Sequence, residues 1–560
     1  MTDKKRPISP VNGEVEHEII KKPNNGNGNH KNNKKIIKRK YKAKDVDPTA
    51  PLGVLQFEID EILSNHQLTR EDITNNMSGI LNDETIQKIY HRIVSDVTIE
   101  SLSSNGDGLA LIPHPDPTKK FQIVIVPFGL PGDKVEIRVF KSHPLYAESD
   151  LLNIIQASEY RDDSLINCKY FGKCSGCQYQ NVNYDQQLIF KRKTIENAYK
   201  FLAPLLSATK GALPSVRSTE PSPLQYKYRT KLTPHFNIPF KKVVEERPNL
   251  GFGSKGRPTW RKDVDIKDGS ILDIEECVIG TPIINQGMTN ERARFSQEFK
   301  KYKKGATILL REDTKVIDKD EEIILAPGSG STDVNGEISH LQSQLPEKQL
   351  VKTCVTASRQ IVKEYVDGYT FEFSAGEFFQ NNNSILPRVI DYVRSNLSID
   401  ENDAKDSNYL VDAYCGSGLF SITCSQNVSK VIGVEVSADS VKFAERNAAS
   451  NKIENAKFIV GKAEEIFKSI DTPADRTSVI LDPPRKGCDD VFLNQLSDYN
   501  PAKIVYISCN VHSQARDVDW FINKTDNGNK YYVESIKGFD FFPQTHHVES
   551  VAVLALKKQD

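Results

Sequence analysis

Cys509 is the residue of this chain whose position most clearly suits chemistry. The apolar, β-branched run 503–507 is typical of a buried strand, and it changes to Ser-Cys-Asn before a polar stretch that suits a helix. Open α/β sheets bind ligands at the carboxyl ends of their strands. The N-terminus of a helix favours a thiolate over a thiol. Cys509 is therefore a candidate nucleophile, and the alternative is a buried cysteine that only packs.

Four other cysteines have the spacing of ligands to a metal centre. Cys168, Cys174 and Cys177 form a C-x5-C-x2-C run, and Cys277 follows one hundred residues later. Four thiolates suit a tetrahedral zinc ion or a [4Fe–4S] cluster. Zinc usually takes two separated C-x2-C pairs, whereas three close cysteines and one distant cysteine are commoner for a cluster. We therefore favour the iron–sulfur cluster, with zinc and a metal-free loop as the alternatives.

A glycine-bearing turn and an acid indicate a nucleoside site in the C-terminal part of the chain, where strands and helices alternate. One strand, 409–414, leads into Gly416 and Gly418, and the next strand ends in Glu435. Such a turn lets the backbone approach a cofactor, and the acid accepts hydrogen bonds from ribose hydroxyls. The run lacks the G-x-G-x-x-G pattern of dinucleotide folds. It is instead typical of enzymes that use S-adenosylmethionine.

Two further carboxylates are expected at the same edge of the sheet. Asp482 ends a strand and begins the run Asp-Pro-Pro-Arg-Lys-Gly, and Glu549 stands before the apolar closing strand 550–554. An aromatic residue after Asp-Pro-Pro would indicate methylation of an exocyclic amine, but Arg485 stands there. A Pro-Cys pair at this strand end would indicate a cytosine-C5 enzyme, but Cys509 lies one strand later. The combination therefore argues against both an exocyclic amine and cytosine C5 as the methyl acceptor.

The composition indicates a soluble intracellular protein of roughly two to four domains. The 560 residues are 38% hydrophobic and 27% charged, and the formal net charge is −1, so nucleic-acid binding must depend on local basic patches. No apolar run approaches the ~18 residues that span a bilayer, and we expect no membrane association. The nine cysteines are few and clustered, which indicates a reducing compartment. We expect the nucleus or the cytoplasm, with the mitochondrion as an alternative.

The N-terminal region divides into two predicted segments. Residues 1–50 are expected to form a disordered basic tail, because they are rich in Lys, Asn, Gly and Pro. Within it, the run 34–44 carries seven cations and is an import signal, a phosphate-binding arm or a solvated tail. Residues 51–95 have helical patterning, and we assign no chemistry to them.

Three more segments complete the predicted organisation. Residues 96–160 alternate with a period of two and are expected to form a small barrel of oligonucleotide-binding (OB) type. Residues 161–375 form a central α+β domain with the cysteine cluster and two segments, 225–231 and 254–262, in which aromatic residues alternate with cations. Such segments stack bases and contact phosphates of RNA, or they are ordinary strand edges. Residues 376–560 form the α/β domain.

From about residue 95 to its end, the sequence resembles the RNA 5-methyluridine methyltransferase family in its fungal tRNA (uracil-5-) branch. The motifs that carry the resemblance are FEFSAGEFFQNN, DAYCGSG, GVE, LDPPRKG, SCN and HHVE, in that order, and the barrel resembles a TRAM domain. The resemblance implies a Rossmann-like class I methyltransferase domain that uses S-adenosyl-L-methionine. It implies Cys509 as nucleophile, Glu549 as proton acceptor and four cofactor-binding residues, Gln380, Tyr414, Glu435 and Asp482.

The resemblance also implies a substrate and a mechanism. The substrate is uridine 54 in the T loop of tRNA. Addition of the Cys509 thiolate to C6 makes C5 nucleophilic, C5 takes the methyl group, and Glu549 removes the C5 proton. The helix N-terminus, Arg485 and Lys486 are expected to activate the thiol. The cysteine quartet resembles the iron–sulfur site of the bacterial rRNA branch. The alternatives are an rRNA (uracil-C5)-methyltransferase, and an RNA-binding or tRNA-folding module with incidental methylation.

Overall fold

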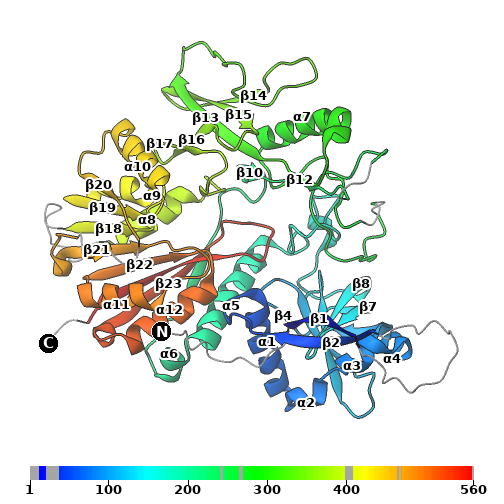
Figure 1. Ribbon diagram of the computed structural model, residues 1–560. Coiled ribbons are helices and arrows are strands. Elements are labelled where there is room, and N and C mark those ends of the chain that lie inside the picture. The colour runs from blue at the N-terminus through cyan, green and yellow to red at the C-terminus, as the bar shows by residue number, and fades with distance from the viewer. Residues whose placement is uncertain are drawn as a thin grey trace, which may run out of the picture.

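The computed structural model describes residues 12–19, 37–239, 244–263, 266, 269–397, 408–462, 466–467 and 470–557. Figure 1 shows a barrel with the N-terminal helices, a central region that contains α7, and a large sheet flanked by helices. In the described part of the chain, every helix is too short or too polar to cross a bilayer.

The first two strands lie in the segment that composition predicts to be unfolded. Strand β1 (Asn12–Ile19) pairs antiparallel with β2 (Ile37–Lys44). The register sets Glu14, Glu16 and Glu18 opposite Lys42, Lys40 and Lys38. A prediction from overall composition does not detect such a strand pair. Residues 1–11 and 20–36 of the predicted tail lie outside the described residues.

Helix α1 packs on the barrel that follows it. It begins with a proline at its first position, where a missing N–H costs nothing, and it buries Leu55, Ile59, Ile62 and Leu63. These side chains meet Leu109 and other residues of the barrel. The four helices of this region are α1 (Pro51–Asn65), α2 (Arg70–Ile73), α3 (Met77–Asn82) and α4 (Glu84–Tyr90).

The barrel is a six-stranded sheet with the order β3-β7-β8-β6-β5-β4. Strand β7 alternates buried and more exposed side chains, as the period of two predicts, and the strands enclose a core of valines, isoleucines and aromatic residues. The bounds are β3 (Ile93–Thr98), β4 (Ser101–Leu102), β5 (Gly108–Pro113), β6 (Phe121–Val126), β7 (Lys134–Ser142) and β8 (Ala147–Gln156).

The central region is built on a four-stranded sheet with the order β10-β13-β15-β14, covered by α7. Two further pairs of strands, β11-β12 and the hairpin β16-β17, form separate two-stranded sheets. The bounds are β10 (Lys231–Leu232), β11 (His235–Phe236), α7 (Pro282–Glu298), β12 (Ala306–Thr307), β13 (Leu310–Asp318), β14 (His340–Gln344), β15 (Lys348–Val355), β16 (Ile361–Val366) and β17 (Tyr369–Ser374).

The C-terminal sheet has eight strands in the order β20-β19-β18-β21-β22-β24-β23-β9. The first five run parallel, and the antiparallel β24 pairs with β22. The strand bounds are β18 (Tyr409–Ala413), β19 (Lys430–Glu435), β20 (Ala456–Val460), β21 (Thr477–Leu481), β22 (Lys503–Ser508), β23 (Tyr531–Phe539) and β24 (Glu549–Leu556).

Helices bury both faces of this sheet in two hydrophobic clusters, which is the arrangement expected of a Rossmann-like domain. The helices of the C-terminal part are α8 (Leu386–Ser395), α9 (Leu419–Thr423), α10 (Ala438–Ser450), α11 (Asp490–Tyr499) and α12 (Val511–Lys524). The predicted fold class is thus confirmed in both the barrel and the α/β sheet.

One stretch from the predicted central domain belongs to this sheet instead. Strand β9 (Arg217–Glu220) pairs parallel with β23, and helix α5 (Tyr184–Leu202) packs against α12. The short helix α6 (Pro204–Ala208) follows α5 and also contacts α12. Figure 1 shows α5 between the sheet and the N-terminal helices. The sequence predicts a boundary near residue 376, because local patterning does not reveal which distant strand β9 joins.

Candidate active site

A cavity of about 1290 Å³ lies at the carboxyl ends of the parallel strands. Five of the six side chains predicted for catalysis and cofactor binding line it: Gln380, Tyr414, Glu435, Asp482 and Cys509. The sixth, Glu549, is buried at the start of β24. Ser508 of β22 faces Ser550 of β24, so Cys509 and Glu549 lie at adjoining ends of neighbouring strands.

One end of the cavity is formed by backbone groups around Glu435. The N–H of Gly416 donates to Glu435 Oε2 at 3.2 Å, and the N–H of Ser437 donates to Oε1 at 2.9 Å. Gly418 has a φ of 93°, which only glycine adopts easily. Tyr414 also has a positive φ, of 66°, a strained conformation of the kind found at ligand sites. The carboxylate is thus held at the tip of β19 by two backbone N–H groups.

Three carboxyl groups at this edge have raised pKa values. Burial, reinforced by the neighbouring Asp482 carboxyl, raises the pKa of Glu549 to about 8. Burial likewise raises the pKa of Asp482 to about 7, with a further contribution from Asp412, whose own pKa is also about 7. Arg485 acts in the opposite direction and lowers the pKa of Glu549. A positive charge at this edge of the sheet would therefore be favourable, because it would stabilise the ionised form of these carboxyl groups.

The pKa of the Cys509 thiol differs from the expectation. Burial, together with the Glu549 and Asp482 carboxyls, raises it to about 12, whereas Arg485 acts in the opposite direction. The sequence predicts activation by Arg485, Lys486 and the helix N-terminus. Arg485 does lower the pKa, but burial and two carboxyls outweigh it. The thiol is therefore protonated in the free protein, and it needs a proton acceptor when it reacts.

Asn510 fixes the turn that carries Cys509. Its side-chain oxygen accepts from the N–H of His512 at 3.2 Å and so caps α12. Its amide nitrogen donates to the carbonyl of Arg485 at 2.9 Å and to that of Thr49 at 3.3 Å. The strand, cysteine and helix follow one another as the sequence predicts. The contact with Thr49 brings the N-terminal segment to the nucleophile, which the sequence does not predict.

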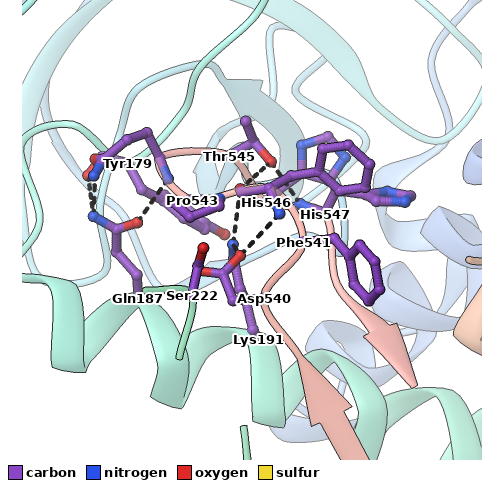
Figure 2. Close-up of polar contacts among 12 residues, drawn as sticks. Tyr179, Gln187, Lys191, Ser222, Asp540, Phe541, Pro543, Thr545, His546 and His547 are labelled. Carbon is purple, nitrogen blue, oxygen red and sulfur yellow. Dashed lines mark hydrogen bonds and ion pairs between the residues drawn. The ribbon is translucent and has the colours of Figure 1, made fainter. Parts of the chain in front are cut away.

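The loop 540–548, which precedes Glu549, is held by two polar residues of α5 (Figure 2). Lys191 Nζ lies 2.5 Å from Asp540 Oδ1 and donates to the carbonyl of Phe542 at 3.0 Å. Gln187 exchanges two hydrogen bonds of 3.1 Å with Gln544, one to its side chain and one from its N–H. The side chains of Lys191 and Asp540 are fully buried. Helix α5 therefore fixes the position of the residue that ends this loop.

The residues after the cysteine run bind the same loop. The N–H groups of Gln178 and Tyr179 both donate to the carbonyl of Gln544, at 3.0 Å. The side-chain oxygen of Gln178 accepts from the N–H of His546 at 3.2 Å. Figure 2 shows His546 and His547 at the turn above Asp540. The cysteine loop and the loop before Glu549 are thus joined through Gln178, which directly follows Cys177.

The sequence analysis did not identify Lys191 and Gln187, although the helical pattern around them indicates that they are buried. They occupy the buried face of α5, with Ile195 and Ala198 continuing the same face. Two polar residues at helical spacing on an otherwise apolar face indicate buried partners elsewhere in the chain. The sequence does not reveal that Asp540 and Gln544 are those partners.

The four cysteines predicted as metal ligands line one cavity. Cys168, Cys174, Cys177 and Cys277 surround a space of about 310 Å³. Within the described ranges, no three acidic, histidine or cysteine side chains are close enough to hold a metal ion. Burial raises the pKa of Cys174 to about 12 and that of Cys277 to about 11. The distant Cys277 does join the other three, while the metal remains a prediction.

The two segments with alternating aromatic and basic residues do not expose their central rings. Tyr228 is buried and its hydroxyl donates to the carbonyl of Pro543 at 3.0 Å. Trp260 is packed in the barrel core beside Phe128 and Phe171. These two rings are therefore unavailable for stacking on bases. Alternation in the sequence is equally compatible with a strand edge, and burial of a whole ring cannot be inferred from it.

Comparison with known proteins identifies two regions of the chain. The family model described as tRNA (Uracil-5-)-methyltransferase matches residues 350–558, and the TRAM domain model matches residues 88–152. The second match coincides with the barrel, and the first with the sheet that carries Cys509. The predicted TRAM barrel and methyltransferase domain are therefore confirmed.

Curated relatives extend the likeness over nearly the whole chain. The tRNA (uracil(54)-C(5))-methyltransferase of Saccharomyces cerevisiae is 58% identical over 553 residues, which is 96% of this chain and 86% of that protein. The Schizosaccharomyces pombe protein of the same name is 41% identical, over 94% of this chain and 87% of its own. The crystal structure of Pyrococcus abyssi tRNA (uracil-54, C5)-methyltransferase with S-adenosyl-L-homocysteine has a TM-score of 0.54 at 22% identity, covering 82% and 99% of the two chains, and shows the same fold.

Proposed function

This chain belongs to the tRNA (uracil-5-)-methyltransferase family, and from this premise we infer that it methylates C5 of uridine 54 in tRNA with S-adenosylmethionine as donor. The observation that carries the inference is the placement of Cys509 and Glu549 at adjoining strand ends, beside a cavity with glycine turns and Glu435. Thiol, acid and nucleoside pocket are the groups that C5 methylation of a pyrimidine requires. The enzyme class thus follows from the family and is supported by the geometry.

The cofactor pocket suits a nucleoside that carries a positive charge. When bound, S-adenosylmethionine supplies an electrophilic methyl group on a cationic sulfonium. We assign the ribose hydroxyls to Glu435, which the N–H groups of Gly416 and Ser437 orient. We assign Gln380, Tyr414 and Asp482, which line the same cavity, to the rest of the cofactor. Asp482 and Glu549 ionise more readily beside a cation, because their pKa values are raised mainly by burial.

Cys509 takes part in the first and the last step of the proposed reaction. Its sulfur bonds to C6 of the uracil, the thiol proton passes to an ionised carboxylate at this edge, and the electrons of the C5–C6 double bond make C5 nucleophilic. After C5 has taken the methyl group, the Glu549 carboxylate accepts the C5 proton. The electrons of the C5–H bond re-form the double bond, and the thiolate leaves C6. Residue roles of this kind are our proposal and are tested by substitution.

The test of this function uses unmodified tRNA, rRNA and labelled S-adenosylmethionine. We expect the wild-type protein to methylate tRNA at uridine 54 and to leave rRNA unmethylated. The Cys509→Ala variant should bind tRNA with unchanged affinity and should neither transfer a methyl group nor form a covalent adduct. Methylation of rRNA instead of tRNA would favour the rRNA alternative. Normal methylation by Cys509→Ala would exclude this mechanism.

We further propose that the four-cysteine cavity holds a [4Fe–4S] cluster. A space of about 310 Å³ lined by four thiols suits a polynuclear cluster better than a single zinc ion, which needs ligands around one point. Four buried thiolates also require positive charge nearby, because burial disfavours their ionised form. Anaerobically purified protein should contain iron and sulfide, and Cys277→Ser should lose both. Stoichiometric zinc without iron would exclude the cluster.

We also propose that the protein resides in the nucleus or the cytoplasm. The proposal is supported by the cationic run 34–44, which resembles an import signal. A fluorescent fusion of the full chain tests it, together with a variant in which Lys38, Arg39 and Lys40 are replaced by Gln. Nuclear signal that depends on these three residues supports import, and mitochondrial signal excludes the proposal.

A further inference from the structure

Three consecutive asparagines follow the glutamine assigned to the cofactor, and the proposed reaction gives them no role. We call residues 380–384 the asparagine loop, which lies between β17 and α8. Its first and third asparagines bind the central region. Arg311 of β13 donates to Asn381 Oδ1 at 3.0 Å. The amide of Asn383 donates to the Glu364 carboxylate of β16. The middle asparagine binds two other parts of the molecule.

Asn382 is fully buried, and both ends of its amide are paired. Its Oδ1 accepts from the N–H and the hydroxyl of Ser384, at 3.1 Å and 2.6 Å. Its Nδ2 donates to Ser222 Oγ and to the carbonyl of Phe541, each at 3.0 Å. A carbonyl only accepts and a backbone N–H only donates, so these partners fix the direction of the amide. The side chain thus joins its own turn to segments 160 residues before it and 159 residues after it.

The bond to Phe541 reaches the segment that positions the proton acceptor. Phe541 is buried and is the second residue of the loop 540–548, which precedes Glu549. Lys191 of α5 holds the first residue of this loop, and Asn382 holds the second. A buried carbonyl that loses its donor is costly, so removal of the Asn382 amide favours a shift of the loop.

The bond to Ser222 leads back to the same loop. The N–H of Ser222 donates to the hydroxyl of Tyr184 at 2.9 Å, and this hydroxyl donates to Asp540 Oδ2 at 2.9 Å. Asp540 directly precedes Phe541, so the path that leaves Asn382 through Ser222 returns beside its other partner. The hydrogen bonds therefore form a closed network, and such a network holds its members more firmly than separate bonds do.

The same asparagine is close to the cofactor pocket along the chain. Gln380, which lines the cofactor cavity, lies two residues before Asn382. The backbone of Asn382 also forms an antiparallel bridge with Arg229 of the central region. A change in the position of Asn382 therefore changes the direction in which the Gln380 side chain enters the cavity. One amide thus lies between a cofactor-binding residue and the loop of the proton acceptor.

We propose that Asn382 is a positioning residue, which holds Gln380 toward the cofactor and Glu549 toward the C5 proton of the uridine. It acts through these two side chains, so its loss affects both cofactor affinity and the last step of the reaction. This inference deepens the proposed function and rests on it, because it takes Gln380 as a cofactor ligand and Glu549 as the proton acceptor.

The test begins with Asn382→Asp, which keeps the oxygen that Ser384 binds and sets a second oxygen against the Phe541 carbonyl. We expect the Kd for S-adenosylmethionine to rise about fivefold and the decay of the covalent RNA adduct to slow about tenfold. With RNA deuterated at C5 of the target uridine, the slowed decay should show a primary isotope effect, because proton removal then limits it. The affinity for tRNA should not change.

Two further variants separate positioning from stability. Asn382→Ala removes the donor without adding an oxygen, should show both losses, and decides the question if Asn382→Asp does not fold. In a Gln380→Ala background, Asn382→Ala should weaken S-adenosylmethionine binding by less than about twofold, because the residue through which it acts is already lost.

Asn451→Asp is the matched control. The Asn451 amide accepts from the N–H of Thr370 at 3.0 Å and donates to its carbonyl at 2.7 Å, as Asn382 does with its own partners. This control should keep wild-type cofactor affinity and adduct decay.

The inference is overturned if the folded Asn382 variants keep the wild-type value of either property, or if adduct decay slows without an isotope effect. Equal losses in Asn451→Asp would also overturn it, because they would indicate general damage to the fold. If the wild-type protein neither methylates tRNA nor forms an adduct, the proposed function fails. The cofactor affinities of the single and double variants still decide whether Asn382 acts through Gln380 in that case.

Discussion

Lys191 and Asp540 form an ion pair of 2.5 Å in which both side chains are fully buried, although 349 residues separate them in the sequence. Tyr184 also donates to the Asp540 carboxylate, at 2.9 Å. Asp540 begins the loop that ends at Glu549, so the pair ties α5 to the strand that carries the proton acceptor. A buried ion pair contributes little net stability but is costly to break from one side, which suits a positioning role.

Replacing Lys191 by Met should therefore trap the reaction after methyl transfer. The unpaired Asp540 charge shifts the loop, Glu549 moves from the C5 proton, and the covalent complex between Cys509 and methylated RNA accumulates. A denaturing gel with label on both RNA and methyl group measures this complex. We expect a loss of about 3–5 kcal/mol in the free energy of unfolding.

The double variant Lys191→Met, Asp540→Asn should recover turnover, because it removes the unpaired charge. Lys193→Met, on an exposed position of the same helix, is the matched control and should behave as wild type. Equal loss of adduct and turnover in Lys191→Met would instead indicate general damage to the fold.

The step that releases methylated RNA should accelerate as pH rises. Glu549 accepts a proton only as carboxylate, and its pKa is raised to about 8, mainly by burial. The rate of adduct decay should thus increase up to about pH 8 and level off above it. Rapid-quench measurement of the adduct over this range tests the assignment. A decay rate that is constant between pH 6 and pH 9 would exclude Glu549 as the proton acceptor.

Replacing Glu549 by Gln should change how stability depends on pH. The folded-state pKa, about 8, exceeds the ordinary glutamic acid pKa of 4.5, so between these two pH values the folded state holds a proton that the unfolded state has lost. The free energy of unfolding of the wild-type protein should fall as the pH rises from about 4.5 to about 8. That of the Gln variant should fall less over the same range. Urea unfolding of both proteins at several pH values gives the difference. Parallel curves would mean that the carboxyl is ionised in the folded protein.

The substitution Gly53→Ala should lower kcat/KM for tRNA without changing the affinity for S-adenosylmethionine. The added methyl group would lie 2.1 Å from the Asp47 carbonyl, so Thr49 must move away from Asn510, which fixes the turn that carries Cys509. Gly253→Ala is the control, because its nearest neighbour would lie 3.6 Å away, at ordinary contact distance. Steady-state kinetics with both substrates separate the effects. Equal kcat/KM values in the two variants would show that the reaction does not depend on the contact between Thr49 and Asn510.

The residues at the catalytic edge of the sheet could be predicted because each is recognised from the sequence immediately around it. Cys509, Asp482 and Glu435 each end a strand, and parallel strands bring their ends to one side of a sheet. The partners of Lys191 could not be predicted, since a helix pattern shows which face is buried but not what covers it. The raised pKa of Cys509 also depends on packing in three dimensions. The hydrogen bond between Asn510 and Thr49 joins residues over 450 positions apart.

The pairing of β9 with β23 bears on how the molecule is made. The outermost strand of the sheet leaves the ribosome some three hundred residues before its partner, so it must wait, unpaired, until almost the entire polypeptide has been synthesised. Expression of residues 376–560 alone would uncover the β23 edge and the face under α5, and such edges promote aggregation. The eight-stranded sheet is therefore completed only late in synthesis.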